Sequence, residues 1–407
     1  MIFNKDEDLK SVYIVHVKRT PIGRLGGGLA PVRPDDLMAL VFADHLKNLS
    51  YDAKEIDDVL VGCANQAGED NRNVGRMAAV LAGIPYEVPA VTLNRLCGSS
   101  LDAVADAYAR IASGMADCIW VGGVESMTRG PYVLSKAQAP FGRDQQMYDT
   151  TFGWRFPNPK MESMFPLFSM GETAEEVARD YKVSREDQDS FALASHQKAI
   201  SAWENGSFKE EVLPVKVQLK KKEYTVEQDE NPRADTSLDA LTKLRPVFRK
   251  DGSVTAGNAS SMNDGAAMAV VVSEEFLKRH NLTPIARITG AGVRGVHPNV
   301  MGIGPIEAVN TLCKRFNKKT SDFDVVELNE AFAAQALACL RELEIDPAIT
   351  NNNGGAIALG HPLGASGVRI LGTLINQMKT NSKLKQGLAS MCIGVGQGVA
   401  LSVENCK

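Results

Sequence analysis

The sequence lacks any C-x-x-C pair, and its cysteines are scattered at positions 63, 97, 118, 313, 339, 392 and 406. This pattern is typical of reduced cytosolic thiols rather than of a disulfide framework or a zinc site. No apolar run approaches the ~20 residues that cross a bilayer, and the opening "MIFNKDEDLK" has the pattern of neither a secretory signal nor a transit peptide. We therefore expect a cytoplasmic protein with no metal site and no membrane partner.

The sequence also lacks a strong charge of either sign. The formal net charge of −4 gives no reason to expect nucleic acid as a partner, although single basic loops can still hold a phosphorylated ligand. A chain of 407 residues, 44% hydrophobic and 23% charged, is typical of a globular protein with two domains of ordinary size.

One cysteine is distinguished by its local setting. The stretch "TLNRLCGSSLDAVADAYARIASG" (92–114) places Cys97 after an extended run and before a pattern that predicts an amphipathic helix ending at Gly114. Ser99 and Ser100 offer capping hydroxyls. A helix N-terminus favours the thiolate, which is the nucleophilic form, and lowers the pKa of the thiol. A buried cysteine that packs as a small apolar side chain is the alternative, and this stretch alone does not decide between the two.

Two parts of the chain share an order of elements. Segments 56–68 and 323–336 each run from an acidic residue through an apolar strand to an Asn-containing turn. Segments 118–127 and 389–404 each contain an apolar strand that breaks into glycines. This repeat, with a spacing of about 265 residues, predicts two copies of an α/β unit.

The region between the two copies has a different character. Its first part, up to about residue 171, is rich in Pro, Gly, Met and aromatic residues and has no sustained period. A helical stretch over 173–204, with Ser184 as a cap, and an exposed, charged hairpin over 217–230 are predicted to follow. Because long irregular segments are usually covers or binding loops, we interpret 128–250 as an inserted lid.

Two further residues lie in glycine-rich settings that suit chemistry. His361 lies in "NNNGGAIALGHPLGASG" (351–367), where the following proline keeps it on a turn, and histidine can act as a general base near neutral pH. Cys392 ends an apolar strand just before the glycines of "MCIGVGQG". A structural histidine and a core cysteine are the alternatives. A cysteine at corresponding places in both halves suggests that one attacks while the other moves a proton.

Two asparagine-containing stretches are less specific when taken alone. In "LNEAFAAQAL" (328–337), Asn329 and Glu330 lie where a strand becomes a helix, so Asn329 either caps the helix or orients a water or a carbonyl. The small residues of "TAGNASSMNDGAA" (255–267) form either a tight backbone crossing or a surface that admits a ligand.

Together and in this order, "NRLCGSS", "NEAFAAQAL", "GGAIALGHPLGASG" and "CIGVGQG" resemble the four signature blocks of the thiolases, which make or cleave 3-oxoacyl-CoA by Claisen chemistry. "RTPIGRLGG" also matches, so the resemblance covers essentially the whole chain. It implies the α/β thiolase fold: two duplicated mixed-sheet halves in an α-β-α-β-α layered core with an inserted loop domain. We expect an N-terminal half over 1–127, completed by 263–284, an inserted loop or lid domain over 128–262, and a C-terminal half over 285–407.

The resemblance also implies a role for each motif residue. Cys97 is the acyl-accepting nucleophile, and His361 is the base that activates it. Cys392 is the acid/base that protonates or deprotonates the methyl carbon of acetyl-CoA. Asn329 holds a water that forms one oxyanion hole with His361, and the backbone N–H groups of Cys97 and Gly394 form the other.

Ligands and assembly follow from the same resemblance. Met170 falls in the acyl pocket, Ser260 contacts pantetheine, and Arg233, by its spacing to "KLRPVF", meets a CoA phosphate. CoA and acyl-CoA are expected as substrates, with no permanently bound cofactor and no metal. A homotetramer of paired dimers is the expected assembly.

Two more stretches, "VGCANQAGEDNRNVGRMAAVLAG" and "DTTFGWRFPNPKM", resemble the bacterial thiolases that act on 3-oxoadipyl-CoA. The expected activity is ping-pong thiolysis of 3-oxoadipyl-CoA to succinyl-CoA and acetyl-CoA. Arg155 or Arg129 is then expected to pair with the substrate carboxylate. The alternative for both is a salt bridge within the protein or a contact within the tetramer. The alternatives are an acetoacetyl-CoA thiolase (acetyl-CoA C-acetyltransferase) and, in a different class, a non-catalytic protein of this fold that binds acyl-CoA or lipid.

Overall fold

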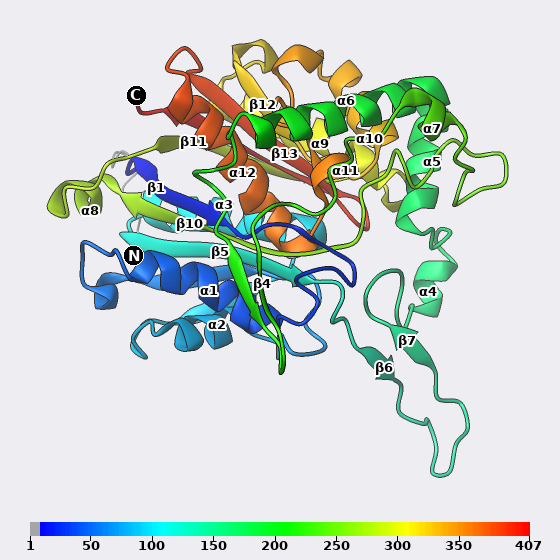
Figure 1. The fold of residues 1–407 in the computed structure, drawn as a ribbon, viewed down its shortest axis with the longest axis horizontal. Coiled ribbons are helices and arrows are strands. Elements are labelled where there is room, and N and C mark those ends of the chain that lie inside the picture. The colour runs from blue at the N-terminus through cyan, green and yellow to red at the C-terminus, as the bar shows by residue number, and fades with distance from the viewer. Residues whose placement is uncertain (1–8) are drawn as a thin grey trace.

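A computed structural model describes residues 9–407. Its main feature is a ten-stranded mixed sheet in the order β12-β13-β14-β11-β1-β10-β5-β3-β4, with the short β2 (Gly23–Arg24) paired to β10 (Figure 1). The strands are β1 (Val12–Arg19), β3 (Asp58–Gly62), β4 (Ala90–Leu93), β5 (Cys118–Ser126), β10 (Asn263–Ser273), β11 (Ala286–Gly295), β12 (Val325–Leu328), β13 (Gln386–Ile393) and β14 (Gln397–Asn405).

The sheet consists of two halves that meet where β1 pairs with β11. This junction has two residue pairs, Tyr13 with Arg287 and Ile14 with Ala286. On either side of it the strand order repeats, because β10, β5 and β3 in one half correspond to β14, β13 and β12 in the other. β3 runs parallel to β5 as β12 runs parallel to β13. The predicted duplication is therefore confirmed.

Two helices form the layer between the sheet halves. α3 (Ser99–Ala112) and α12 (Leu363–Thr380) pack against each other, and apolar residues from both helices join strand residues of both halves in one core. The contact is close at Gly367, where an added Cβ would lie 2.2 Å from the backbone N of Leu101. Glycine at this position allows the two helix backbones to approach.

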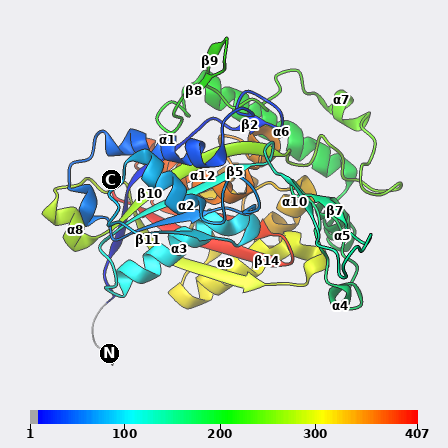
Figure 2. The same cartoon turned by 90° about the horizontal axis from the view of Figure 1, so that it is seen from below.

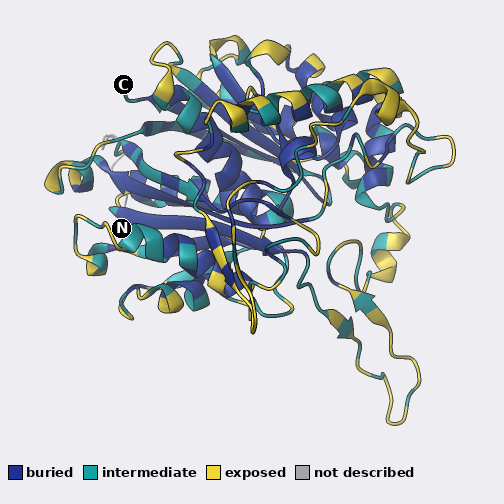
Figure 3. Cartoon of the chain, in the orientation of Figure 1, coloured by how far each residue is buried: buried dark blue, intermediate teal, exposed yellow. Residues whose placement is uncertain are grey.

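Helices also cover the outer face of each sheet half. α1 (Pro34–Leu46) and α2 (Val74–Ala82) bury their apolar faces on β3, β5 and β10, while α9 (Gly304–Phe316) and α10 (Ala333–Glu342) cover β12, β13 and β14 (Figures 1 and 2). Six of the strands are buried almost throughout (Figure 3): β3, β5, β10, β12, β13 and β14. The expected α-β-α-β-α architecture is confirmed.

The chain between β5 and β10 forms the insertion. The hairpin of β6 and β7 extends away from the layered body (Figure 1), whereas two helices of the insertion, α5 and α6, pack against α10 of the C-terminal half. Within residues 9–407, no helix combines the length and apolarity needed to cross a membrane. The elements of the insertion are β6 (Tyr132–Leu134), β7 (Met147–Asp149), α4 (Pro159–Glu162), α5 (Met170–Asp180), α6 (Arg185–Glu204), β8 (Val215–Gln218), β9 (Glu223–Val226) and α7 (Leu238–Thr242).

The helical stretch predicted over 173–204 is divided into α5 and α6. Lys182 has a φ of 52°, a left-handed conformation that ends the first helix. Ser184 then caps α6 as predicted, because its side chain accepts a hydrogen bond from the backbone N–H of Asp187. The charged hairpin predicted over 217–230 is present as the β8–β9 pair.

Candidate active site

Cys97 lies in a tight turn between β4 and α3. A 3-10 turn over Leu96–Gly98 follows the end of β4, and α3 begins at Ser99. The predicted strand–turn–helix setting is thus confirmed. Leu96 has a φ of 46°, which is uncommon for a residue other than glycine. The candidate nucleophile is therefore presented by a strained turn.

The two serines that begin α3 do not cap it. The hydroxyl of Ser99 accepts from the backbone N–H of Arg95 at 3.0 Å and donates to the carbonyl of Leu96 at 2.6 Å. Ser100 Oγ accepts from the backbone N–H of Val368, on α12, at 3.0 Å. The predicted capping role is wrong: one serine closes the turn, and the other fastens α3 to α12.

The C-terminal half brings Cys392 and Gly394 to this turn. Cys392 is the penultimate residue of β13, and Gly394 follows the end of that strand. A Cβ added to Gly98 would lie 2.5 Å from Ile393 Cδ1, which shows how closely the two turns pack. The backbone N–H of Gly394 donates a hydrogen bond to the sulfur of Cys97, and Cys97 lies close enough to Cys392 to help raise the pKa of the Cys392 thiol. The two cysteines, one from each half, share one site.

His361 lies in the turn between α11 (Ala356–Leu359) and α12. Its backbone N–H donates to Asn263 Oδ1 at 2.8 Å, and its Nδ1 lies 2.6 Å from Ser366 Oγ. Its Nε2 is buried and has no hydrogen-bond partner among residues 9–407. The first turns of α12 pack against α3 and the Cys97 turn. His361 is therefore fixed at one ring nitrogen while the other is available to a ligand.

Asn329 directly follows β12 and is completely buried. Its backbone N–H donates to the carbonyl of Ser390, on β13 two residues before Cys392. Its Oδ1 lies 3.5 Å from Nη2 of Arg369, whereas its Nδ2 has no partner in the described part of the chain. Since α10 begins at Ala333, Asn329 does not cap that helix. Its amide group is available for a ligand or a water instead.

The electrostatic setting of Cys97 differs from the sequence-based expectation. Burial raises the pKa of Cys97 to about 11, although the backbone N–H groups of Gly394 and Cys97 act in the opposite direction. Burial, and to a lesser extent the charge of Arg369, lower the pKa of His361 to about 3. Burial also raises the pKa of Cys392 well above its usual value. These shifts favour a neutral thiol and a neutral imidazole in the resting site, in contrast to the thiolate expected from the helix N-terminus.

Met170 borders the site from the insertion. It is the first residue of α5, and its Sδ would lie 3.5 Å from a Cβ placed on Gly394. Met170 also packs in a small apolar cluster that includes Phe332 and Cys392. Ser169 caps α5 and forms a capping box with Glu172, which fixes the position of Met170.

Ser260 lies on the segment that crosses the site between the two halves. Its backbone N–H donates to the carbonyl of Ala331 at 3.0 Å, and Met262 forms a bridge with His361. The small residues of 255–262 therefore run along the "NEAFA" turn and the His361 turn, as a tight backbone crossing would. Ser261, the residue after Ser260, donates a hydrogen bond to Asn263 Oδ1 at 2.9 Å.

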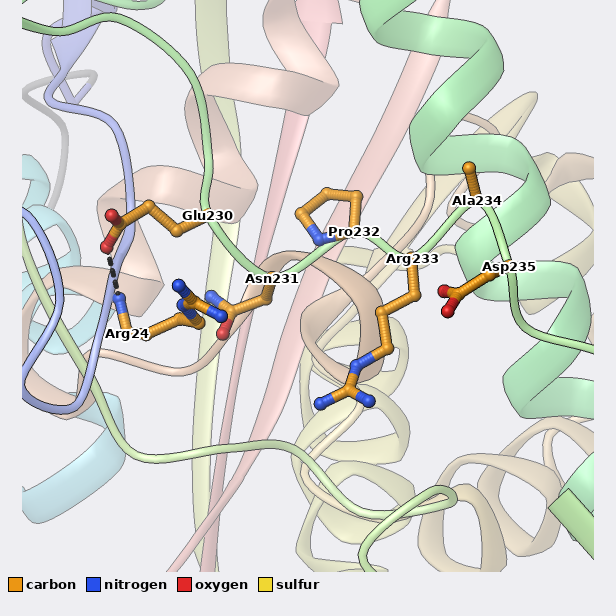
Figure 4. A pocket seen from close by; sticks show the side chains of 7 residues that line it. All are labelled: Arg24, Glu230, Asn231, Pro232, Arg233, Ala234 and Asp235. Carbon is orange, nitrogen blue, oxygen red and sulfur yellow. Dashed lines mark hydrogen bonds between the residues drawn. The ribbon is translucent and has the colours of Figure 1, made fainter. Parts of the chain in front are cut away.

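Arg233 lies apart from the cysteines, in a cavity of about 430 Å³ that it shares with Arg24 (Figure 4). No hydrogen bond from either guanidinium is found among residues 9–407, and Glu230 accepts from the backbone N–H of Arg24 instead. Glu230 and Asp235 also line this cavity. Asn231 Nδ2 donates to the carbonyl of Leu359, two residues before His361, and so connects the cavity to the His361 turn.

Sequence reasoning missed two buried charged residues at the site. Glu125 accepts from the backbone N–H groups of Ala64, Asn65 and Gly364, so it ties the ends of β3 and β5 to the start of α12. Arg369 lies within α12 and contacts Asn329. Each is a charged residue inside an otherwise apolar strand or helix, a signal that the sequence does contain. In the described part of the chain, no three His, Cys, Asp or Glu residues cluster as a metal site.

The chain belongs to the thiolase family. The family models "Thiolase, N-terminal domain" and "Thiolase, C-terminal domain" match residues 12–275 and 282–405. A beta-ketoadipyl-CoA thiolase of Pseudomonas knackmussii is 55% identical over 97% of this chain and 99% of its own length. A 3-oxoadipyl-CoA/3-oxo-5,6-dehydrosuberyl-CoA thiolase of Escherichia coli is 50% identical over 97% of this chain and its full length. The protein is therefore an acyltransferase of the thiolase class.

Solved structures support the same assignment. An acetyl-CoA acetyltransferase of Bacillus anthracis has a TM-score of 0.91 at 39% identity and covers 98% of this chain and 99% of its own. A human mitochondrial 3-ketoacyl-CoA thiolase in complex with CoA has a TM-score of 0.90, also at 39% identity, and covers 97% of this chain and 98% of its own. Thiolases use CoA as a substrate, so CoA and acyl-CoA are the ligands of this fold.

Proposed function

We propose that this thiolase cleaves 3-oxoadipyl-CoA with CoA to give succinyl-CoA and acetyl-CoA. The observation that carries the proposal is the joining of Cys97 and Cys392, one from each half, at a site that also presents the Gly394 N–H. The names of the relatives at 50 to 55% identity support the choice of substrate.

In the first step, His361 Nε2 takes the proton of the Cys97 thiol as the sulfur attacks C3 of the substrate. The neutral resting pair suits a transfer that is coupled to attack, because neither a free thiolate nor an imidazolium has to be buried beforehand. The C2–C3 bond then breaks. The acyl part remains on Cys97 as a thioester, and the electron pair leaves with acetyl-CoA as an enolate.

The enolate oxygen is stabilised by the protonated His361 and by a water that Asn329 holds. Cys392 donates its proton to the enolate carbon, and acetyl-CoA leaves. The raised pKa of Cys392 supports its role as the acid, because the thiol keeps its proton until a strongly basic carbon needs it. These residues account for enolate stabilisation by hydrogen bonding and proton transfer.

In the second half-reaction, Cys392 takes the proton of CoA, and the CoA sulfur attacks the acyl group on Cys97. The N–H groups of Cys97 and Gly394 stabilise the oxyanion of this step. The acyl group leaves as acyl-CoA, and Cys97 recovers a proton from His361. Ping-pong kinetics follow, because acetyl-CoA departs before CoA enters.

We further propose that Arg155 pairs with the distal carboxylate of the substrate. Its Nη1 donates to the carbonyl of Thr150, and no other hydrogen bond of this guanidinium is found within residues 9–407. Its neighbour Trp154 donates to the carbonyl of Phe168, two residues before Met170, and Thr150 is held by Asn65. Arg155 therefore lies between two segments that adjoin the site.

Arg129, the other candidate, is less suited to this role. Its guanidinium makes two contacts with Glu69 and donates to the carbonyl of Ala30 at 3.1 Å. This is the intramolecular salt bridge that the sequence left open as an alternative, and it leaves few donors for a ligand.

For CoA, we propose that Arg233 contacts a phosphate, Ser260 contacts pantetheine and Met170 lines the acyl pocket. Two observations support this path: the guanidiniums of Arg24 and Arg233 make no hydrogen bond within residues 9–407, and Asn231 links their cavity to the His361 turn. CoA would enter and leave as a substrate, with no cofactor bound permanently. An absorbance spectrum and a native mass of the purified protein test whether a cofactor stays bound.

The domain division over 1–127 with 263–284, 128–262, and 285–407 is likewise our proposal. It is supported by β10, which follows the insertion yet pairs with β1 and β5 of the first half. We also propose a homotetramer in the cytoplasm. The exposed apolar side chains of the β6–β7 hairpin support assembly, and the absence of disulfides among the seven cysteines supports a reducing compartment. The hairpin side chains concerned are Tyr132, Leu134, Phe141 and Met147.

The test of function follows the loss of 3-oxoacyl-CoA absorbance on addition of CoA, with 3-oxoadipyl-CoA and acetoacetyl-CoA compared. A large advantage in kcat/KM for the dicarboxylic substrate is expected. Equal or faster turnover of acetoacetyl-CoA would make the protein a general acetyl-CoA C-acetyltransferase. Binding of both substrates without turnover would make it a non-catalytic acyl-CoA-binding protein.

A further inference from the structure

Arg369 is a charged residue in the most deeply buried layer of the protein. It lies on α12 two turns beyond His361, and only 2% of it is exposed. Its Nε and Nη1 have no hydrogen-bond partner among residues 9–407. Because burying an arginine with unsatisfied donors costs free energy, its presence here needs a reason other than stability.

The two groups nearest its charged end belong to β12 and the turn that follows. Nη1 lies 3.7 Å from Glu327 Oε2, and Nη2 lies 3.5 Å from Asn329 Oδ1. The contact with Asn329 is long for a hydrogen bond, but Arg369 can only be the donor in it. Arginine carries donors and no acceptor, so an amide NH₂ group turned toward it would place donor against donor.

The orientation of Asn329 is thereby determined. With Oδ1 toward Arg369, the planar amide must direct Nδ2 away from the cation. Nδ2 is buried and has no protein partner within the described residues. Among residues 9–407 no other side chain donates to Oδ1, so within this part of the chain Arg369 alone distinguishes the two ends of the amide by a hydrogen bond.

We propose that Arg369 is a positioning residue that fixes the amide of Asn329 with its NH₂ group toward the reacting atoms. This inference rests on the role proposed above for Asn329 in holding the water of the enolate oxyanion hole. A misplaced amide presents an acceptor where a donor is needed, and preorganised donors are what stabilise a developing oxyanion.

The consequence is specific to one half-reaction. Cleavage of the C2–C3 bond creates the enolate, which needs Asn329. Exchange of an acyl group between Cys97 and CoA creates a tetrahedral oxyanion, which uses the N–H groups of Cys97 and Gly394 instead. Loss of Arg369 should therefore slow carbon–carbon cleavage and leave acyl exchange nearly intact. A general loosening of the fold would slow both.

Glu327, the carboxyl beside Arg369, allows Arg369 to be replaced without leaving an unpaired charge in the core. Burial raises the pKa of Glu327 to about 8 even beside the Arg369 cation, so this carboxyl is largely protonated at neutral pH. Arg369→Met therefore does not leave a bare carboxylate in the core, and the double variant Arg369→Met/Glu327→Gln removes the guanidinium and the titratable carboxyl at similar volume. Glu327 Oε1 accepts from Gln377 at 2.8 Å, and a glutamine at position 327 can retain that bond.

The experiment measures two rates in each variant: thiolysis of 3-oxoadipyl-CoA, and exchange of labelled CoA into succinyl-CoA. For Arg369→Met/Glu327→Gln and for Asn329→Ala we expect thiolysis to fall by about 10- to 100-fold and exchange by less than about 3-fold. Thr373→Val is the matched control, since it removes a buried hydrogen bond to Glu211 one turn further along α12. It should leave both rates near those of the unmodified protein.

The outcomes distinguish a failure of the Arg369 role from a failure of the proposed function. If Asn329→Ala slows thiolysis and the Arg369 variants do not, the role of Arg369 is wrong and the proposed function stands. A parallel fall in thiolysis and exchange in the Arg369 variants, with melting temperatures unchanged, also overturns the positioning role. If Asn329→Ala leaves thiolysis intact, the role of Asn329 fails and this inference fails with it.

Discussion

The Nδ1 atom of His361 lies 2.6 Å from Ser366 Oγ, and that hydroxyl lies 3.0 Å from the carbonyl oxygen of Pro362. A serine hydroxyl has one proton. Because the carbonyl can only accept, the hydroxyl donates to Pro362 and must accept from His361. The proton of the neutral imidazole therefore resides on Nδ1, and the lone pair on Nε2 is directed to the substrate side, as a general base requires.

Replacing Ser366 with alanine should remove this control of the tautomer. We expect Ser366→Ala to lower kcat/KM for thiolysis by about 10- to 100-fold, because a fraction of the imidazole then carries its proton on Nε2. The affinity for CoA should change little. Steady-state kinetics and a thermal melt check both points, and a variant with unimpaired kcat/KM would show that the tautomer is set by something else.

Alkylation of Cys97 tests the neutral resting site. Since burial raises the pKa of this thiol to about 11, the thiolate fraction should increase about tenfold for each unit of pH between 7 and 10. We expect the rate of iodoacetamide labelling at Cys97, followed by peptide mass mapping, to rise with pH in the same proportion.

The variant Cys97→Ala identifies the label that reacts elsewhere, because Cys313 and Cys406 are partly exposed. A labelling rate that levels off near pH 7 would mean that the backbone N–H groups and the α3 dipole outweigh burial. The sequence-based expectation of a resting thiolate would then be correct after all.

Substrate selection should depend on Arg155. We expect Arg155→Ala to lower kcat/KM for 3-oxoadipyl-CoA by about 10-fold or more and to leave acetoacetyl-CoA thiolysis unchanged within about 2-fold, because only the former has a distal carboxylate. Arg129→Ala is the matched control, since Arg129 is already paired with Glu69. Equal losses with both substrates would remove Arg155 from carboxylate recognition.

Much of this site could be predicted from the sequence because its groups lie in local contexts that short motifs encode. The turn of Cys97 between a strand and a helix, the turn of His361 before Pro362, and the end of an apolar strand at Cys392 all follow from spacing and from turn chemistry. Their order along the chain then indicated the family and with it the layered fold.

The remaining features depend on contacts between residues far apart in the sequence. The pKa of Cys97 is set by packing against the turn at Gly394, which belongs to the other half. Ser100 lies at a position where serine often caps a helix, but its hydroxyl accepts a hydrogen bond from Val368 on α12 instead. Glu125 meets Gly364 across 239 positions. No local sequence pattern encodes these long-range contacts. The burial that they cause and the resulting pKa shifts therefore could not be predicted from the sequence.

The crossing of α3 and α12 should tolerate no side chain at Gly367. A Cβ there would lie 2.2 Å from the backbone N of Leu101, and only a shift of one helix would relieve the contact. We expect Gly367→Ala to lower the free energy of unfolding by about 1–3 kcal/mol or more and to reduce kcat, because α12 follows His361 directly.

Gly372, on the same helix, is the matched control for that variant. A Cβ at this position would make ordinary contacts, the nearest 3.7 Å from Val17 Cβ. Gly372→Ala should therefore be neutral or stabilise the protein by about 0.5–1 kcal/mol, because alanine favours the helix. Urea unfolding of both variants measures the difference. Equal stabilities would show that α3 and α12 can shift apart at this contact without a loss of stability.

Glu125 should make the free energy of unfolding fall as pH rises from about 4.5 to about 7. Burial raises its pKa from 4.5 to about 7 in the folded protein. Between these two values the folded state binds more protons than the unfolded state, so the free energy of unfolding decreases with increasing pH. The contribution is fully present below about pH 4.5 and is lost above about pH 7, and it amounts to at most about 3 kcal/mol. In Glu125→Gln this slope should be smaller by the Glu125 contribution, as urea midpoints at pH 5 and pH 7.5 would reveal. Glu69→Gln provides a contrast of opposite sign, since Arg129 lowers the pKa of Glu69 and that contribution is lost on acidification. A slope that survives unchanged in Glu125→Gln would assign the effect to another buried carboxyl such as Glu327, whose pKa is also raised.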